Sequence, residues 1–550
     1  MLQQISSSIL NLQLWIGATL AFIVPFGLSY VCYWLTNQRK RRRKGRNKRV
    51  DGGAKGKSII DQPVRPALED NLLILKEVIG HSSDVRFRSL SVDEGRRNIA
   101  VVYIEGLVNH SSLQDHIIRP IMEAGKIRGA RDEAEASAEQ TKQYLLQHVI
   151  QAAHTNIVTN IEQCVREIVT GNTILLIDGT DRVAILSTPK EKGRSIDEPV
   201  TEAVIRGAHE GFVENLSPNI GLLRKRIKDH QLSVIPYTIG RRSLTEVSLV
   251  FMKDLCDEAI LNEVKRRLDS IEIDNVLESG YIEQIMEDNY LSFFPQMQTT
   301  ERPDRVVGAL MEGRIAILTD GTPMALIVPV TLPTFMSAPD DYYERWLPGT
   351  FVRLLRYLAA GIALFLPSIY IAMISYNHGL IPTKLAISIA SGREGVPFPS
   401  LFEALMMEIT IEILREAGLR LPKPIGQAVG IVGGLVIGQA AVQAGIVSPV
   451  MVIIVALTAM SSFAIAQYEM GISIRLLRFF SMISAGIFGI YGIVLFGIFI
   501  TAHLVKLKSF GVPYTLPFGP MKPVEWKDSL VRMPMPFLKI GTPFNKKKHK

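Results

Sequence analysis

The sequence predicts a duplicated cytosolic α/β domain followed by an α-helical membrane domain. Three observations support this fold class. A chain of 550 residues is too long for one ordinary core. Charged residues crowd its first two-thirds, whereas most residues in 357–501 are apolar or small. Two pairs of segments in the charged part also resemble each other in the same order.

These observations divide the chain into five regions. They are an N-terminal transmembrane anchor with a basic juxtamembrane tract (1–57), a first cytosolic α/β subdomain with a connector (58–238), a second such subdomain (239–347), a multi-helix membrane domain (348–505) and a basic C-terminal tail (506–550). Residues 58–347 contain no apolar run long enough to span a bilayer. We therefore expect both subdomains to lie on one side of a membrane, in the cytosol.

The predicted anchor is the apolar segment Leu14–Trp34, about 21 residues long. Nine Lys or Arg follow it between Arg39 and Arg49. A cleaved signal peptide carries its charge before a shorter apolar run, so we expect an uncleaved span with its basic end in the cytosol. A basic cluster can also bind nucleic acid. Its position beside an apolar span favours a signal that sets the orientation of this span in the membrane. Contact with anionic lipid is compatible with that role, and we expect no nucleic-acid partner.

Two kinds of local pattern recur about 145 residues apart along the chain. A β-rich run, a polar turn and an amphipathic helix are predicted at 98–124 and again at 246–272. A strand, an Asp-Gly-Thr turn and a second strand are predicted around Asp178 and again around Asp320. The repetition indicates two copies of one α/β unit, roughly Ser82–Pro189 and Ile239–Val330.

The Asp-Gly-Thr motif has two possible meanings. An aspartate before Gly-Thr serves as a phosphoryl-accepting nucleophile in some hydrolases. Asp and Gly also supply the positive φ angles of a tight hairpin. Because the motif is duplicated and β-rich runs flank both copies, we favour the hairpin.

Several apolar segments in the C-terminal part are candidate membrane spans, and their number is open. Four are long enough to cross a bilayer: Leu354–Tyr376, Ile425–Gly445, Ser448–Ala466 and Leu477–Ala502. With four spans, the Lys-rich tail returns to the cytosol. The segment Leu401–Ala417 is apolar but acidic and could be a fifth span, in which case Ile381–Ala390 could be a re-entrant piece.

Glu408, Glu412 and Glu416 are spaced four residues apart and therefore share one side of a helix. A carboxylate that faces lipid costs about 2.5–3.5 kcal/mol on insertion. This side must face water, a partner or a pore, and copies around an axis would form rings of acidic groups such as line cation pathways. In the alternative, the helix lies flat at the interface and Arg415 and Arg420 pair its carboxylates. We slightly favour pore-lining roles for the three glutamates.

A row of glycines follows this acidic helix. Gly426, Gly430, Gly434 and Gly438 repeat at every fourth residue, which places a smooth stripe on one helix face. Such a stripe lets a second helix approach closely, so these glycines are candidates for specific helix packing. Membrane helices are rich in glycine in any case, and generic packing is the alternative.

The sequence gives no sign of an enzyme. It contains no HExxH, GxSxG, Walker A or GxGxxG pattern, and its histidines lack metal-ligand spacing. The cysteines Cys32, Cys164 and Cys256 form no CxxC pair, so neither a disulfide framework nor a zinc site is implied. We expect no cofactor and no metal, and we expect Cys164 and Cys256 to be core thiols.

Strings through most of the chain, from about Asn98 to Phe480, resemble the A subunits of spore germinant receptors of the GerA type. In the soluble part they include Val200–Ile227, Ile271–Gln284, Phe293–Gly313 and the segment Pro339–Arg345 at the predicted membrane boundary. In the membrane part they include Leu364–Tyr370, Val396-Pro-Phe-Pro399 and Glu403–Gly445, with Arg415-Glu-Ala-Gly-Leu-Arg-Leu-Pro-Lys-Pro-Ile-Gly426. So many strings in the same order make the resemblance specific.

The resemblance implies a multi-pass receptor subunit in the inner membrane of a dormant spore. Such subunits assemble with a transporter-like B subunit, thought to bind the nutrient, and with a C lipoprotein. Family members are similar to oligomeric ligand-gated ion channels, in which A subunits surround the conduction path. The sequence departs from the family pattern at Leu14–Trp34 and the basic tract.

Two other assignments compete with this one. The first is an accessory germination protein of the stage V sporulation AF type, which works beside the dipicolinate channel. The second is a secondary transporter, which would show paired inverted repeats in the membrane part. Repetition is visible only in the soluble half, which counts against the transporter.

Overall fold

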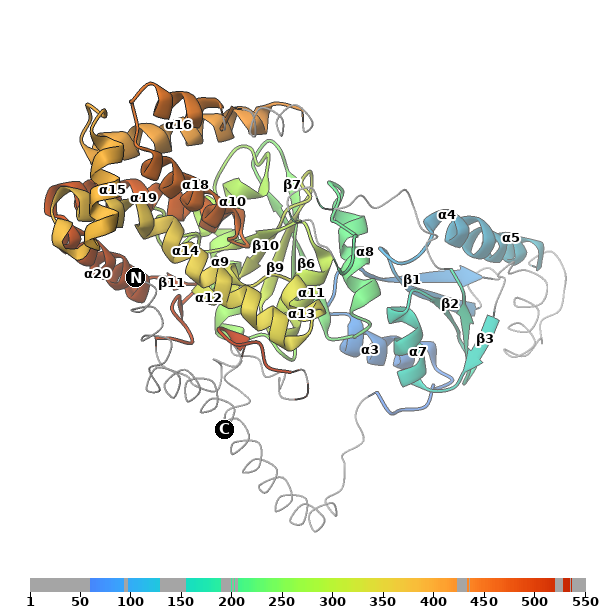
Figure 1. Ribbon diagram of the computed structural model, residues 1–550. Coiled ribbons are helices and arrows are strands. Elements are labelled where there is room, and N and C mark those ends of the chain that lie inside the picture. The colour runs from blue at the N-terminus through green and yellow to red at the C-terminus, as the bar shows by residue number, and fades with distance from the viewer. Residues whose placement is uncertain are drawn as a thin grey trace, which may run out of the picture. The chain divides into compact units, whose positions relative to one another are not determined.

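The computed structural model describes residues 60–92, 97–128, 155–188, 199, 202, 206–422, 433–434, 436–519, 528–534 and 536. The predicted anchor Leu14–Trp34 and its basic tract lie outside these residues. The chain divides into two compact units, 1–62 and 63–550. Every element described below belongs to the second unit, in which two α/β repeats are followed by a helical region (Figure 1).

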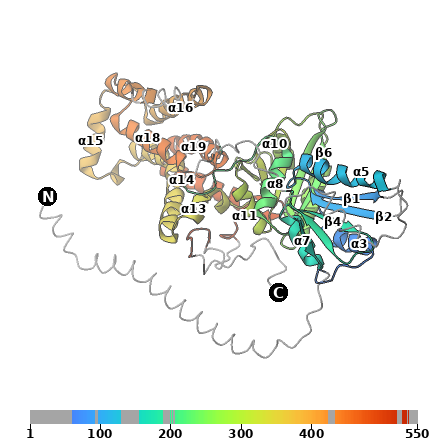
Figure 2. The same cartoon turned by 90° about the vertical axis from the view of Figure 1, so that its right-hand side faces the viewer.

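The first repeat contains an antiparallel sheet of five strands in the order β1-β2-β4-β5-β3. Its elements are α3 (Leu68–Ile79), β1 (Val85–Val92), β2 (Arg97–Ile104), α4 (His110–Leu113), the π-helix η2 (Gln114–Ile118), α5 (Arg119–Arg128), β3 (Thr155–Val158), α7 (Ile161–Val169), β4 (Thr173–Ile177) and β5 (Val183–Leu186). Helices α3 and α7 cover one face of the sheet, and α4 to α5 cover the other (Figures 1 and 2). This repeat is therefore a three-layer unit with two apolar cores.

The second repeat has the same architecture, with strand order β6-β7-β9-β10-β8. Its elements are α8 (Leu216–Arg226), β6 (Leu232–Ile239), β7 (Thr245–Met252), α9 (Glu258–Asp269), α10 (Ser279–Met286), β8 (Gln298–Thr300), α11 (Pro303–Met311), β9 (Ile315–Thr319) and β10 (Ala325–Val328). Helices α8 and α11 cover one face, and α9 and α10 cover the other. Each strand position of the first sheet has its counterpart in the second, so the predicted duplication is confirmed at the level of topology.

The duplication extends to individual hydrogen bonds. The Oδ1 atom of Asp178 accepts from the backbone N–H of Leu68 at 3.0 Å, and Oδ1 of Asp320 accepts from that of Leu216 at 3.0 Å. Each aspartate thus satisfies a free N–H at the start of the first helix of its own repeat. The two Asp-Gly-Thr segments are tight turns between strands, with φ of +85° at Gly179 and +88° at Gly321. The hairpin interpretation of the motif is therefore confirmed.

The second repeat begins earlier than the sequence indicates. Helix α8 lies in the segment between the two predicted units, yet it packs on the second sheet through Leu216, Leu222 and Leu223. Strand β6 pairs with β7 over residues 232–239. The predicted subdomain boundary between 238 and 239 therefore falls inside the second sheet, because helix α8 carries too weak an amphipathic pattern to mark the start of the unit.

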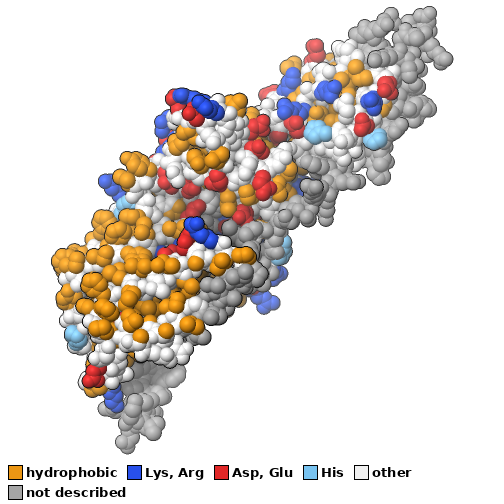
Figure 3. Space-filling model, turned by 90° about the horizontal axis from the view of Figure 1, so that it is seen from above, with side chains coloured by type: hydrophobic (Ala, Val, Ile, Leu, Met, Phe, Trp, Pro, Cys, Tyr) orange, Lys and Arg blue, Asp and Glu red, His pale blue; other side chains and the backbone are white. Residues whose placement is uncertain are grey.

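The helical region follows the second repeat directly. Its elements are α12 (Leu332–Met336), α13 (Asp340–Tyr343), α14 (Trp346–Ser375), the 3-10 helix η4 (His378–Leu380), α15 (Thr383–Arg393), α16 (Ser400–Arg420), α18 (Pro449–Phe463), α19 (Tyr468–Phe488), α20 (Ile490–Lys506) and the short strands β11 (Lys508–Ser509) and β12 (Val512–Pro513). Among the described helices, α14 and α19 are long and apolar enough to cross a membrane, whereas α18 and α20 are shorter apolar helices. Figure 3 shows hydrophobic side chains gathered over this region and charged ones over the α/β part.

The predicted single span Leu477–Ala502 is wrong. The chain turns at Gly489, where φ is +62°, and the two sides form the separate helices α19 and α20. A Cβ atom at Gly489 would lie 3.2 Å from the side chain of Tyr376, so both backbone angle and space favour glycine. The apolar composition continues through the turn, which explains why hydropathy alone predicts one helix here.

Candidate functional site

Helix α16 carries the acidic side chains that the sequence singles out. It begins directly after Pro399 and ends two residues before Pro422, and proline at these positions limits a helix on both sides. Its neighbours in the helical region are α14, α18 and α19. Four glutamates along it, Glu403, Glu408, Glu412 and Glu416, meet very different surroundings.

Glu403 is fully buried near the start of α16. Its Oε1 atom accepts hydrogen bonds from the backbone N and the Oγ of Ser448, each at 2.6 Å. Ser448 is the N-cap residue of α18, so the carboxylate lies against the positive end of that helix. The Nη1 of Arg393 lies 3.3 Å from Glu403 Oε2. Glu403 therefore joins α15, α16 and α18 in one buried polar contact.

Glu408 is also buried, five residues further along α16. The Nη1 of Arg478 in α19 lies 3.1 Å from its carboxylate, and both side chains are about 1% exposed. The pair fastens α16 to α19 in the interior of the helical region. The carboxylate of Glu408 is thus in contact with Arg478 and enclosed in the described residues.

Glu412 and Glu416 reach the surface. Their side chains are 41% and 60% exposed. Both border an open hollow of about 590 Å³, whose lining consists of Ile409, Glu412, Ile413, Glu416, Ala417, Arg420 and Phe479. The lining combines four apolar residues with Glu412, Glu416 and Arg420, so the hollow is the accessible part of the acidic face.

Arginines accompany the exposed carboxylates as well. Arg415 Nη1 lies 3.1 Å from Glu412, and Arg420 Nη2 lies 2.8 Å from Glu416. These are the two pairings that a flat interfacial helix would use. Arg475 of α19 adds a third cation, 3.5 Å from Glu412. The acidic face thus carries its own countercharges, and the pore-lining roles of Glu408, Glu412 and Glu416 remain a prediction.

The glycine row is only partly visible. Gly426 and Gly430 lie outside the described residues. A Cβ atom at Gly434 would lie 3.9 Å from Leu414, and one at Gly438 would lie 3.4 Å from Val452, which are ordinary contacts with side chains of α16 and α18. Among the described glycines of 426–438, the closest contact is at Gly433, outside the predicted row, where a Cβ atom would come within 2.8 Å of Leu414. Specific packing through the row therefore stays a prediction.

The second repeat and α19 meet through polar side chains. Thr299 of β8 donates to Glu469 Oε1 at 2.6 Å, and Gln467 donates to Glu202 Oε1 at 3.0 Å. Arg305 of α11 lies 2.9 Å from the same carboxylate of Glu202. Helix α19 therefore begins on the edge strand of the second sheet, and its middle carries Arg478, the partner of Glu408.

The start of α14 forms a second junction. Asp341 is buried between Arg353, at 3.2 Å, and Arg356, at 2.8 Å. Residues 528–532 of the C-terminal segment cross this junction, where Tyr342 donates to Asp528 at 3.0 Å and Arg532 donates to the carbonyl oxygens of Tyr342 and Glu344. The segment Pro339–Arg345 is thus connected to α14 and to residues 528–532 by ion pairs and hydrogen bonds.

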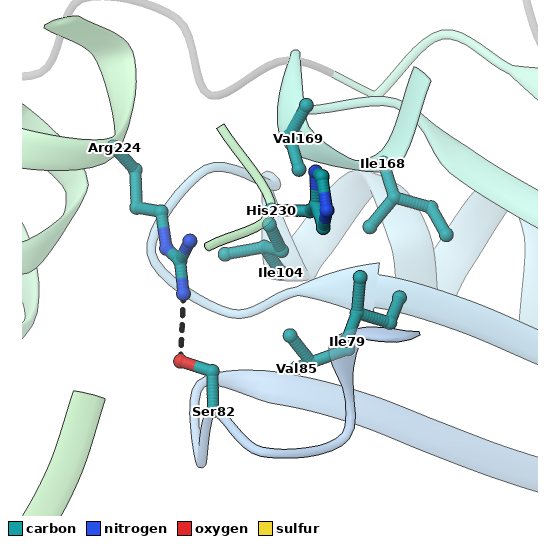
Figure 4. Close-up of a pocket in the computed structure, with 8 residues that line it drawn as sticks. All are labelled: Ile79, Ser82, Val85, Ile104, Ile168, Val169, Arg224 and His230. Atoms are coloured by element: carbon teal, nitrogen blue, oxygen red, sulfur yellow. Dashed lines mark hydrogen bonds between the residues drawn. The ribbon is translucent and has the colours of Figure 1, made fainter. Parts of the chain in front are cut away.

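A third polar cluster joins the two repeats. Arg224 of α8 donates to both carboxylate oxygens of Asp84 at 2.8 Å and to Ser82 Oγ at 2.7 Å. Figure 4 shows its guanidinium beside the apolar side chains of the first repeat and near His230. The residues around it leave no room for a water-sized molecule. This cluster therefore connects the two repeats and leaves no space for a ligand.

The described residues contain no group of three or more His, Cys, Asp or Glu that could hold a metal ion. Cys164 and Cys256 are buried and free, which confirms that they are core thiols. Burial raises the pKa of each thiol to about 12. Neither is suited to act as a nucleophile near neutral pH.

Sequence reasoning missed the arginine partners of the acidic face. Arg475 and Arg478 stand within the apolar part of the chain, where a charged side chain indicates a buried partner. That signal was available, but it does not say which of the glutamates each arginine meets. Glu408 and Arg478 are 70 residues apart. Only the packing of α16 on α19 brings them together.

Comparisons with known proteins identify the family. The chain matches the family model described as "Bacillus/Clostridium GerA spore germination protein" over residues 73–541. The chain therefore belongs to the GerA spore germination family. Its relatives are named as germination or membrane proteins.

Three relatives come from Bacillus subtilis (strain 168). The uncharacterized membrane protein YfkQ is 46% identical over 86% of this chain and 90% of its own length. Spore germination protein B1 is 42% identical over 86% of this chain and 96% of its own length. Spore germination protein A1 is 45% identical over 74% of this chain and 83% of its own length.

One solved structure is also similar. It is the crystal structure of the N-terminal domain of the A subunit of the Bacillus megaterium spore germinant receptor GerK3. It is 30% identical, with a TM-score of 0.38, and covers 49% of this chain and 97% of that chain.

Proposed function

We propose that the chain is a membrane subunit of a nutrient germinant receptor that triggers spore germination, and that copies of it form the oligomeric ion-conducting part of the receptor. Membership of the GerA family supports the receptor role. Its partners would be a transporter-like B subunit, a lipoprotein C subunit and further copies of itself. It would be a multi-pass protein of the spore inner membrane with its α/β repeats in the cytosol.

The observation that supports conduction is the hollow beside α16. Glu412 and Glu416 border it, and the rest of its lining is mostly apolar. Copies arranged around an axis with this face inward would place rings of carboxylates along the path, an arrangement that favours cations. The buried Glu408–Arg478 pair would hold α16 in position beside this path.

The same contacts provide a route for a signal. Helix α19 begins against the second repeat at Thr299 and meets α16 through Arg478. A displacement of the second repeat would therefore move α19 and change the position of the acidic face. Nutrient binding by a partner subunit could act on α16 in this way.

The test is early cation release from spores after a nutrient mixture is added. We expect Glu412→Gln and Glu416→Gln together to change the rate or the cation selectivity of release, because both remove negative charge from the hollow. The matched control is Glu272→Gln, which removes an exposed carboxylate paired with Arg241 in the second repeat. Unchanged release from the double variant, at a normal protein level, would remove the conducting role.

A further inference from the structure

The loop between α10 and β8 exposes large apolar side chains. Tyr290 is 80% exposed and Leu291 is 74% exposed. The loop is nevertheless well ordered by its own hydrogen bonds: Asn289 Oδ1 accepts from the N–H of Leu291 at 3.1 Å, and Gln296 donates to the carbonyl oxygen of Asn289 at 2.7 Å. Two adjacent apolar side chains on a fixed loop are placed to contact an apolar surface when they continue a larger apolar patch.

The loop is fastened to the apolar helices. Ser292 Oγ lies 2.9 Å from His503 Nε2 near the end of α20. The ring of Phe293 lies 5.6 Å from that of Phe480 in α19, centroid to centroid. Phe480 is twelve residues after the start of α19 at Tyr468, which is about 18 Å along the helix axis. The loop tip therefore reaches well past the end of α19 that contacts the second repeat.

Apolar side chains continue from the loop along both helices. Four exposed examples are Leu476 and Ile483 in α19 and Phe499 and Val505 in α20. If α19 and α20 lie in a bilayer, this surface faces lipid. The loop tip then lies where the lipid surface meets the second repeat, since it is attached to the same two helices.

The surroundings of the loop include two exposed lysines as well as the carboxylates of Glu287 and Asp288. Lys506 at the end of α20 and Lys508 in β11 are both exposed. The neighbouring carboxylate of Asp288 is engaged by Arg267 at 2.6 Å and by the N–H of Phe510 at 2.6 Å. Aromatic rings and lysines at one level are typical of the membrane–water interface, and lysines there attract anionic lipids.

We propose that loop 289–294, together with Lys506 and Lys508, docks on the headgroup layer of an anionic phospholipid bilayer. Tyr290 and Leu291 enter the boundary between headgroups and acyl chains, and the two lysines contact lipid phosphates. This inference rests on the proposed function, because it requires α19 and α20 to lie in the membrane. Its consequence is that the second repeat is held at the membrane by lipid as well as by helix contacts.

The test uses the full chain in lipid nanodiscs that contain phosphatidylglycerol. Cysteines are placed singly at Tyr290, Leu291, Leu73 or Val494 in a background where Cys32, Cys164 and Cys256 are alanine, and each is labelled with an environment-sensitive fluorophore. Spin-labelled lipids then quench any label that touches the bilayer. Leu73 lies on α3 of the first repeat, is 65% exposed and serves as the water-exposed control. Val494 lies on α20, is 52% exposed and serves as the membrane control.

We expect the labels at Tyr290, Leu291 and Val494 to be quenched several-fold more than the label at Leu73. Replacing Lys506 and Lys508 with Gln should weaken the quenching at Tyr290 in anionic discs and not in phosphatidylcholine discs. If Val494 is quenched and Tyr290 behaves like Leu73, the docking is wrong and the membrane assignment survives. If Val494 is not quenched either, the proposed function itself fails.

A second copy of the chain is the competing occupant of this surface. In that case, the labels at Tyr290 and Leu291 would be shielded from water, but spin-labelled lipids would not quench them. Cysteines at these positions would also cross-link between chains. That result would overturn docking on lipid.

Discussion

The two α/β repeats have the same strand order and the same aspartate contact at the start of their first helix, yet they have different neighbours. The first repeat is joined to the second by the Arg224–Asp84 pair. The second is also joined to the helical region, through Thr299, Ser292 and the apolar cluster around Phe294 and Phe335. Duplication has thus produced one unit that contacts the helices and another attached to it.

This difference indicates separate roles. A displacement of the second repeat acts directly on α19 and α20, because side chains from both sides share a core there. A displacement of the first repeat reaches the helices through the second repeat, across the Arg224–Asp84 pair and the hydrogen bonds of Ser82 and Ser83 with Val234. The four predictions below test that division, from the largest expected effect to the smallest.

Arg224→Ala should be the most damaging change. It leaves Asp84 buried without its partner, and the loss of one member of a buried ion pair costs about 3–5 kcal/mol. We expect a clear drop in the apparent melting temperature of the detergent-solubilised chain. Arg224→Met with Asp84→Leu removes both charges and should recover most of the loss. If Arg224→Ala melts like the parent chain, the Arg224–Asp84 ion pair contributes no stability.

Asp178→Ala and Asp320→Ala form a matched pair across the repeats. Each removes the acceptor for a free helix N–H and should cost about 1 kcal/mol. Because the second repeat contacts the helices, we expect only Asp320→Ala to slow germination after a nutrient mixture is added. Equal germination defects in the two variants, at equal protein levels, would contradict the division of roles.

Glu283 of α10 gives a pH-dependent comparison. Burial, followed by the negative charges of Glu469, Glu287 and Glu278, raises its pKa from 4.5 to about 9. The folded chain holds this proton more tightly than the unfolded chain, so the stability due to the protonated group is present at low pH and is lost as pH rises from 4.5 towards 9.

Glu283→Gln keeps a neutral side chain and removes that dependence. Its melting temperature should match the parent chain at about pH 4 and exceed it increasingly up to about pH 9. Glu272→Gln, on an exposed carboxylate, should show no such trend. A constant difference between Glu283→Gln and the parent chain across this range would show that Glu283 is not buried among like charges.

The buried thiols give the smallest effect. Cys164 in the first repeat and Cys256 in the second should react with a maleimide only slowly at about pH 8, because both are buried and their pKa values are raised to about 12. In Arg224→Ala we expect the reaction of Cys164 to accelerate more than that of Cys256. Equal acceleration of the maleimide reaction at the two cysteines would mean that both repeats are destabilised together.

The local features of the α/β repeats could be predicted from the sequence. A hairpin around Asp178 depends on residues within a short stretch, and its recurrence around Asp320 exposes the duplication. The boundary at β6 could not be predicted, because helix α8 carries few regularly spaced apolar residues and resembles a connector. Its role becomes clear only when it packs on the second sheet.

The acidic helix was predictable as a helix but its surroundings were not. Spacing alone places Glu408, Glu412 and Glu416 on one side. Whether that side meets water or arginine depends on α19, which follows about fifty residues later in the sequence. The break at Gly489 was hidden for a different reason: the residues on both sides are apolar, and hydropathy does not record a positive φ angle.

The most direct test of the division between the repeats is hydrogen–deuterium exchange of the full chain with and without Arg224→Ala. The contacts described here predict faster exchange in β1 to β5, while β6 to β10 and the first half of α19 remain protected. Faster exchange of similar size in both sheets and in α19 would contradict the account, because it would show that the two repeats and the helices open as one unit.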